Sequence, residues 1–158
     1  MTITATIITL NEEKNIARCI RSLIGVVDEI IVLDSFSTDD TKKICADFDL
    51  KFVEREWEGY SESKNHLNSL ASSTYILSID ADEELDSDLR KSIMDIKASE
   101  SGVYSFNRLT NYCGKWIYHS GWYPDIKTRL FPKKGSSWKG KYVHEELEFD
   151  PKQKLTQL

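Results

Sequence analysis

The chain has 158 residues, of which 40% are hydrophobic and 30% are charged, a balance that excludes a disordered or fibrous protein. A net charge of −5 leaves no domain-wide basic field, so nucleic acid is not expected as a partner. No apolar run approaches the roughly 20 residues that a membrane-spanning helix needs.

Cysteine usage and the N-terminus both indicate a cytoplasmic protein, either free or at the inner face of a membrane. Cys19, Cys45 and Cys113 are too scattered for a disulfide framework or a zinc site. Cys19 and Cys45 fall in helical patterns and are expected to be buried. The first residues carry no basic segment of the kind that begins a signal peptide.

Strands and helices alternate over the first 100 residues. Short β-branched or apolar runs predict strands at 3–9, 29–33, 51–53 and 74–79. Apolar residues at helical spacing predict four helices: one after a cap at Asn11 and ending at Gly25, one after 37–40 that includes Phe48, one over 60–70 and one over 86–98. This order is typical of βαβ units, so we predict an α/β fold with a mostly parallel sheet flanked by helices.

The predicted strands turn from apolar to polar or acidic where they end. These ends lie at 9–12, at 34–35 and at 80–82. In an open α/β sheet, ligands bind in the crevice beyond the carboxyl ends of the strands. We therefore expect these polar clusters to converge on one site.

The pattern changes after Gly102. Residues 103–108 alternate like a strand, and aromatic residues and glycines fill the stretch that follows. We expect one domain over 1–158, in which 1–100 form the ligand-binding half and 101–150 form a small, irregular, antiparallel region. Residues 151–158 are polar and are expected to be a frayed end.

A basic run occupies residues 127–141, with six Lys or Arg and no acid. Such a run suits an anionic ligand or an acidic membrane surface. A solvated lysine-rich loop explains it equally well.

The strongest chemical signal is the pair Asp80 and Asp82, which directly follows an apolar strand. Both carboxylates can reach one hard cation at such a turn, and Mg²⁺ or Mn²⁺ bound there would neutralise a diphosphate leaving group. The alternative is that the acids at 82–84 only begin the next helix, where they complement its dipole.

Six segments together resemble glycosyltransferase family 2, which has the GT-A fold. They are IITLNEE at 7–13, VLDSFSTDDT at 32–41, SKN at 63–65, ILSIDADEEL at 76–85, GKWIYHSGWYPDIKTRLF at 114–131 and VHEEL at 143–147. The last two resemble the branch of lipopolysaccharide-core β-1,4-glucosyltransferases. Proteins of that branch are usually longer, so this chain is expected to be a C-terminally shortened form in which donor binding is the firmer expectation.

The resemblance implies a set of donor-binding residues: Thr9, Asn11 and Glu12 at the base and ribose, Asp34 at the uracil, Lys64 near the donor, Asp80 at the ribose, Asp82 on the metal, and Arg129 after the acid in the family's pattern. Each has a structural alternative. Asn11 could only cap a helix, Asp34 could only end a strand, and Lys64 could be a solvated helix position.

The resemblance also implies an inverting reaction, in which a carboxylate takes the proton of the acceptor hydroxyl. Asp125 is the candidate base, beside an aromatic acceptor platform, although Pro124 stands where family members commonly carry a second acid. Glu145 is the rival base. His144 would complete the metal shell, bind a phosphate, or be a structural surface histidine.

The function expected from the resemblance is transfer of a hexose, taken to be glucose, from a UDP-sugar to a lipopolysaccharide-core or related glycan or glycolipid acceptor. Residues 1–100 would then bind the nucleotide sugar, and 101–150 would form the acceptor side. The alternative is a non-catalytic module that binds nucleotide sugars or carbohydrate. The absence of glycine from residues 10–17 argues against a nucleotidyltransferase and against a dinucleotide-binding oxidoreductase.

Overall fold

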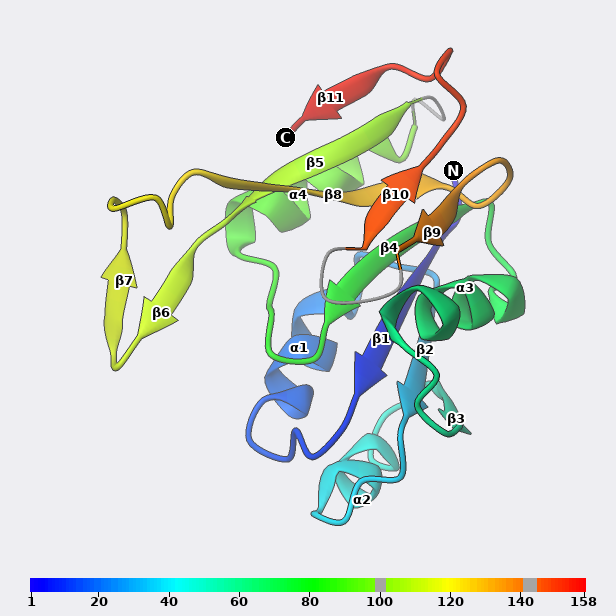
Figure 1. The fold of residues 1–158 in the computed structure, drawn as a ribbon, viewed down its shortest axis with the longest axis vertical. Helices are drawn as coiled ribbons and strands as arrows, with labels where there is room; N and C mark the ends of the chain where they lie inside the picture. The colour runs from blue at the N-terminus through cyan, green and yellow to red at the C-terminus, as the bar shows by residue number, and fades with distance from the viewer. Residues whose placement is uncertain (99–101, 141–144) are drawn as a thin grey trace.

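The computed structural model describes residues 1–98, 102–140 and 145–158. Within these residues the main sheet has seven strands in the order β11-β5-β8-β4-β1-β2-β3 (Figure 1). Its strands are β1 (Ile3–Thr9), β2 (Glu29–Asp34), β3 (Lys51–Glu54), β4 (Tyr75–Asp80), β5 (Val103–Arg108), β8 (Asp125–Pro132) and β11 (Leu155–Gln157). Two small antiparallel pairs are β6 (Thr110–Tyr112) with β7 (Lys115–Ile117), and β9 (Ser137–Lys139) with β10 (Glu146–Glu148). The helices are α1 (Ile16–Leu23), α2 (Thr41–Cys45), α3 (Tyr60–Leu70) and α4 (Ser87–Ile96).

The sheet combines a parallel part with an antiparallel extension. Strand β1 pairs in parallel with β2 and β4, and β3 pairs in parallel with β2. Strand β8 runs antiparallel between β4 and β5, so it joins the two predicted halves of the chain in one sheet. The prediction of a mostly parallel α/β sheet with a small antiparallel region after residue 100 is confirmed.

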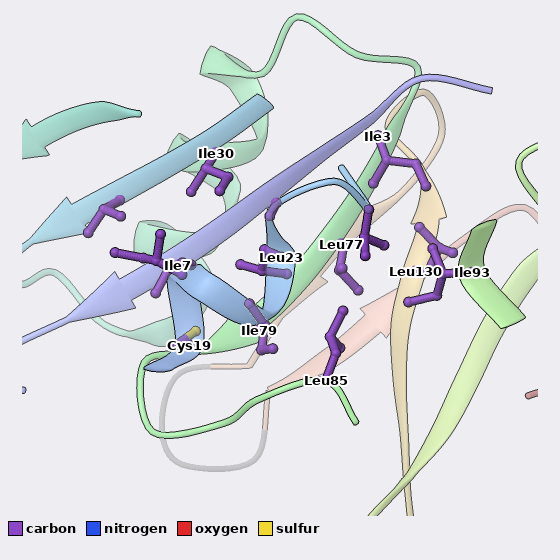
Figure 2. Close-up of a cluster of buried hydrophobic side chains, with 14 of the residues drawn as sticks. Ile3, Ile7, Cys19, Leu23, Ile30, Leu77, Ile79, Leu85, Ile93 and Leu130 are labelled. Carbon is purple, nitrogen blue, oxygen red and sulfur yellow. The ribbon is translucent and has the colours of Figure 1, made fainter. Parts of the chain in front are cut away.

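Both faces of the sheet are covered, because successive side chains of a strand point to opposite faces. Ile7 and Leu77 face the cluster that contains Cys19 and Leu23 of α1 and Ile93 of α4 (Figure 2). The opposite face carries a second cluster, in which Leu67 of α3 belongs with strand residues such as Ile31, Leu33 and Ile76. Two-sided burial explains why these strands are continuous apolar runs.

The helix boundaries differ from the prediction near the strand ends. Helix α1 begins at Ile16 after Asn15, so the expected cap at Asn11 is wrong. Asn11 instead has a positive φ of 55° and lies in the loop after β1. Helix α2 ends at Cys45 and does not include Phe48. Helix α3 has the predicted bounds, and α4 begins after Asp86, whose side chain accepts a hydrogen bond from the Leu89 amide at 2.8 Å.

The C-terminal residues are not a frayed end, which corrects the expectation for 151–158. Strand β11 pairs in parallel with β5, and the Leu158 amide donates a hydrogen bond to the Ser105 carbonyl at 3.0 Å. Strand β5 would otherwise present unpaired backbone groups at the edge of the sheet. The sequence did not predict this strand because the segment is short and polar and has no apolar alternation. It forms a strand by pairing with the existing edge strand β5.

The pairing of β5 with β8 contains a β-bulge. Tyr104 pairs with Leu130, whereas the next residue, Ser105, pairs with Thr128. Arg129 is therefore an extra residue on β8 with no partner on β5. Bulges of this kind change which way the following side chains point.

Two further sequence expectations concern burial and membranes. Cys19 and Cys45 are buried as expected, and Cys113 is exposed. Burial, with a smaller effect of Asp34, raises the pKa of the Cys45 thiol to about 11, which makes it unreactive. Among the described residues, the helices are all too short or too polar to cross a bilayer.

Candidate functional site

The carboxyl ends of β1, β2 and β4 meet at one edge of the sheet, as predicted. Thr9 lies opposite Asp34 in the β1–β2 register, and Ile8 lies opposite Asp80 in the β1–β4 register. The polar residues that end the three strands are therefore neighbours in space. This edge is where an open α/β sheet binds its ligands.

Asn11 and Asp34 shape the two loops that follow β1 and β2. The Asn11 side-chain oxygen accepts a hydrogen bond from the Thr38 backbone amide at 2.8 Å. The Asn11 backbone amide donates to the Ser37 hydroxyl at 2.8 Å. Asp34 is fully buried and accepts from the Ser37 amide at 2.7 Å and from the Ser37 hydroxyl. Both side chains thus hold the loops together, a structural role that the sequence did not indicate.

Glu12 and Thr9 complete this side of the site. The Glu12 amide donates to the Thr41 hydroxyl at 2.8 Å, and its carboxylate accepts from the Asn15 side chain at 2.8 Å. The Thr9 hydroxyl is buried and has no hydrogen-bond partner among the described residues. A buried polar atom of this kind is costly unless something binds it.

Lys64 is buried, not solvated, and it connects two acids. Its side chain is only 3% exposed, and its ammonium lies 2.6 Å from the Glu145 carboxylate and 3.5 Å from that of Asp80. It also lies over the Trp138 ring at 4.7 Å. The alternative of a solvated helix position is wrong for Lys64, and Glu145 is committed to this ion pair.

Arg129 forms the next link, between Asp80 and Glu83. One guanidinium nitrogen lies 2.7 Å from each of the two carboxylates. Burial alone would raise the pKa of Asp80, but Arg129 and Lys64 outweigh it and hold that pKa below its ordinary value. Asp80 is thus ionised and held by two cations.

Asp125 lies at the other end of the same set of charges. Arg108 contacts it at 2.7 Å, Lys127 contacts it at 3.0 Å, and Arg108 also reaches Glu83 at 3.4 Å. Partial burial would raise the pKa of Asp125, but its hydrogen bonds with Lys127 and Arg108 lower it on balance. The carboxylate is therefore in the form that accepts a proton.

These contacts form one chain of alternating charge along the edge of the sheet: Glu145, Lys64, Asp80, Arg129, Glu83, Arg108, Asp125 and Lys127. We call it the charge chain. Arg108 was not among the expected site residues, and Glu83 was expected only to begin a helix. Arg108 ends a predicted strand, as Asp34 and Asp80 do, and that position was the signal that could have identified it.

Asp82 lies beside the charge chain and has a different environment. It is exposed and lines a cavity of about 980 Å³ together with Glu83, Asp125 and Arg129. The structure gives its carboxylate no hydrogen bond or ion pair within the described residues, and its backbone carbonyl accepts from Arg18 at 2.9 Å. Asp82 and Asp125 thus open into one cavity, whereas Lys64 and Glu145 lie outside its lining.

The fit of Asp82 to a metal follows from these surroundings. In the described part of the chain, no three His, Cys, Asp or Glu side chains come together in a group that could hold a metal ion. Mg²⁺ and Mn²⁺ commonly use one or two carboxylates and complete their shell with water and substrate phosphates. Asp82 fits that arrangement. The second predicted ligand, His144, lies outside the described residues.

Four of the six basic residues in the run at 127–141 contact other residues of the chain. Lys127 and Arg129 belong to the charge chain, Lys133 donates to the Ala71 carbonyl at 2.6 Å, and Lys139 pairs with Glu148 at 2.6 Å. Of the remaining two, Lys134 is exposed and Lys141 lies outside the described residues.

The charge chain makes the fold sensitive to acid. Because the pKa of Asp80 is lowered in the folded state, ionised Asp80 stabilises the fold above its unfolded pKa of about 3.9. That stabilisation is lost as the pH falls through the lowered folded value. We expect the urea midpoint to fall between about pH 5 and pH 3 more steeply in the wild type than in Asp80→Asn. Parallel pH profiles for the two proteins would contradict this assignment.

Sequence comparison identifies relatives across almost the whole chain. The profile of "Glycosyl transferase family 2" matches residues 4–146. The chain is 42% identical over 129 residues to an uncharacterized glycosyltransferase of Rickettsia typhi, covering 79% of this chain and 41% of that protein. It is 34% identical over 106 residues to the lipopolysaccharide core biosynthesis glycosyltransferase LpsC of Rhizobium meliloti, covering 64% of this chain and 39% of LpsC. The chain thus spans about two fifths of the length of these curated relatives.

Solved structures show the same fold. TarS residues 1–349 of S. aureus, in complex with UDP-GlcNAc, superimpose with a TM-score of 0.63 at 20% identity, covering 84% of this chain and 46% of that one. Glucosyl-3-phosphoglycerate synthase of Mycobacterium tuberculosis, in complex with Mn²⁺, UDP and phosphoglyceric acid, gives a TM-score of 0.52 at 27% identity, covering 67% and 42%. These likenesses confirm the predicted GT-A type of α/β fold.

Proposed function

We propose that this chain, which belongs to glycosyl transferase family 2, transfers a hexose from a UDP-sugar to a glycan or glycolipid acceptor. One observation carries the proposal: Asp82 and Asp125 open into one cavity at the carboxyl edge of the sheet, and the charge chain passes beside both. A donor diphosphate and an acceptor hydroxyl need these two kinds of carboxylate within reach of one another.

The donor is proposed to lie over the ends of β1, β2 and β4. The unpartnered Thr9 hydroxyl and the Asn11–Glu12 loop are proposed to hold the base and ribose, with Asp34 fixing the loop beneath the uracil. Asp80 is proposed to lie at the ribose, and Lys64 is proposed to lie near the donor. Arg129 is proposed to hold Asp80 and Glu83 in place, because both of those contacts are already made. The UDP complexes of the two solved relatives support uridine as the nucleoside.

Asp82 is proposed to hold Mg²⁺ or Mn²⁺, together with His144 and the donor phosphates. Such an ion supplies neutralisation of the charge that develops on a diphosphate leaving group. The exposed, unpaired carboxylate of Asp82 supports this role, and so does the Mn²⁺ in the complex of the mycobacterial synthase.

Asp125 is proposed as the base of an inverting displacement. Its carboxylate would accept the proton of the acceptor hydroxyl as that oxygen bonds to the anomeric carbon and the bond from that carbon to the diphosphate breaks. Both carboxylates are in ion pairs, but Asp125 lines the cavity and the rival Glu145 does not. Geometry therefore favours Asp125 over Glu145.

The acceptor is proposed to be a lipopolysaccharide-core or related glycan, which the resemblance to LpsC supports. Glucose is the proposed sugar, in line with the branch that the later motifs resemble. A glycolipid acceptor would bring the chain to the cytoplasmic face of a membrane. The second candidate is a non-catalytic module that binds nucleotide sugars or carbohydrate, and acceptor-stimulated release of UDP distinguishes it from a transferase.

Removal of the Asp82 carboxylate tests the donor site. We expect Asp82→Ala to abolish the Mn²⁺-dependent part of UDP affinity, a loss of about tenfold or more, since a metal–phosphate bridge needs a carboxylate on the protein side. Calorimetric titration of UDP with and without Mn²⁺ measures it. Glu84→Ala is the matched control, because Glu84 is a neighbouring acid that lines the same cavity. An equal Mn²⁺ effect in both variants would refute the metal role.

A further inference from the structure

The cavity that contains Asp82 and Asp125 has two chemically different walls. One is the charged edge of the main sheet described above. The other is formed by the β6–β7 hairpin and the segment after it, which contribute Asn111, Trp116 and Trp122. In Figure 1 this hairpin projects from the end of β5, away from the parallel strands. The second wall is unused by the proposed donor site.

The aromatic wall is held in place by local contacts. Asn111 lies directly opposite Trp116 in the hairpin, so the two side chains share one face. The Asn111 side-chain oxygen accepts from the Gly114 amide at 3.0 Å, which fixes the turn. Tyr112 meets Trp122 edge-to-face, with ring centroids 5.8 Å apart. Trp116 and Trp122 are nevertheless 51% and 45% exposed, a large apolar area to leave open to solvent.

The cations of the cavity are already neutralised. Arg18 pairs with Glu84, and Arg108, Lys127 and Arg129 pair with acids of the charge chain. A ligand with a phosphate or carboxylate would compete with these acids for the same cations. A neutral ligand with hydroxyl groups meets the side-chain amides of Asn111 and Asn107 without such competition.

We propose that Trp116 and Trp122 form a binding site for a neutral pyranose ring of the acceptor. This inference rests on the proposed function and specifies its acceptor. A pyranose has an apolar C–H face that packs on an aromatic ring and a rim of hydroxyls that hydrogen-bond to carboxylates and amides. A cavity of about 980 Å³ has room for more than one such ring, since small-molecule sites span roughly 300–1,000 Å³. The ring that carries the reacting hydroxyl would lie toward Asp125, and the preceding ring would stack on the aromatic wall.

Saturation-transfer NMR without donor tests the site directly. The first probes are neutral oligosaccharides built from glucose, galactose, mannose, N-acetylglucosamine and heptose. The second probes are the 6-phosphates of these monosaccharides. We expect saturation transfer to the neutral probes, strongest at the ring C–H protons. We expect Trp116→Ala and Trp122→Ala to bind these probes about tenfold more weakly. Trp116→Phe keeps a ring and should retain most of the affinity. Trp57→Ala is the matched control, because Trp57 is 48% exposed and packs on Tyr60 at 4.8 Å outside the cavity.

The outcomes separate this proposal from the proposed function. Three results would each overturn the pyranose site. These are no saturation transfer to any neutral probe, saturation transfer to phosphorylated probes alone, or an equal loss of saccharide affinity in Trp57→Ala and Trp116→Ala. UDP titration on the same samples tests the donor site independently. Saccharide binding without UDP binding would refute the transferase proposal and leave the pyranose site standing.

Discussion

Asp125→Asn is expected to lower the rate of sugar transfer by about 10²–10⁴-fold while leaving UDP affinity unchanged. The substitution keeps the shape of the side chain but removes the only form that can accept the acceptor proton. Because Asp125 lies on β8 and the donor is proposed to lie over β1, β2 and β4, donor binding should survive. Release of UDP with acceptor present measures transfer, and calorimetry measures binding.

Two controls make this result specific. Asp86→Asn removes a carboxylate from the same cavity but keeps the cap of α4, since asparagine caps helices as well as aspartate. It should transfer at nearly the wild-type rate. Glu145→Gln tests the rival base. Unchanged turnover in Asp125→Asn together with abolished turnover in Glu145→Gln would overturn the assignment, and absence of acceptor-stimulated UDP release from the wild type would favour the non-catalytic module.

Arg129→Met is expected to destabilise the fold by about 3–5 kcal/mol. The side chain of Arg129 is only 10% exposed, and its loss removes a partner from both Asp80 and Glu83. The pKa of Arg129 is lowered by burial but raised on balance by Glu83 and Asp80, so the folded state favours its charged form. Urea unfolding followed by circular dichroism measures the change.

The matched control for this second prediction is Lys139→Met. Its ion pair with Glu148 has a similar length of 2.6 Å, but the two side chains are 63% and 58% exposed. Exposed pairs contribute about 0–1 kcal/mol, so this variant should unfold almost like the wild type. Arg129→Lys keeps a charge and should fall between the two. A loss below about 1 kcal/mol in Arg129→Met would show that the charge chain is not a source of stability.

Sequence patterns predicted the parallel part of the fold because its evidence is local. Apolar runs such as 29–33 and the helix at 60–70 carry their own pattern, and the polar ends of the strands indicated where the candidate site residues come together. The charge chain is different, since Lys64 and Glu145 are 81 residues apart and their ion pair exists only after the sheet and the β9–β10 pair have formed. No spacing rule relates two such residues. The burial of Lys64 and the part played by Arg108 therefore emerged only from the structure.

The bulge at Arg129 has a consequence for how tolerant this strand is to change. Asp125, Lys127 and Leu130 do not follow a strict alternation, yet Lys127 lies opposite Phe106 and Leu130 opposite Tyr104, and Phe106, Tyr104 and Leu130 all belong to one core cluster. The extra residue shifts the alternation of side chains by one position between the polar and the apolar part of the strand. Adding or losing a single residue at this bulge would turn the side chains on one side of it to the opposite face of the sheet, even if every residue type were kept.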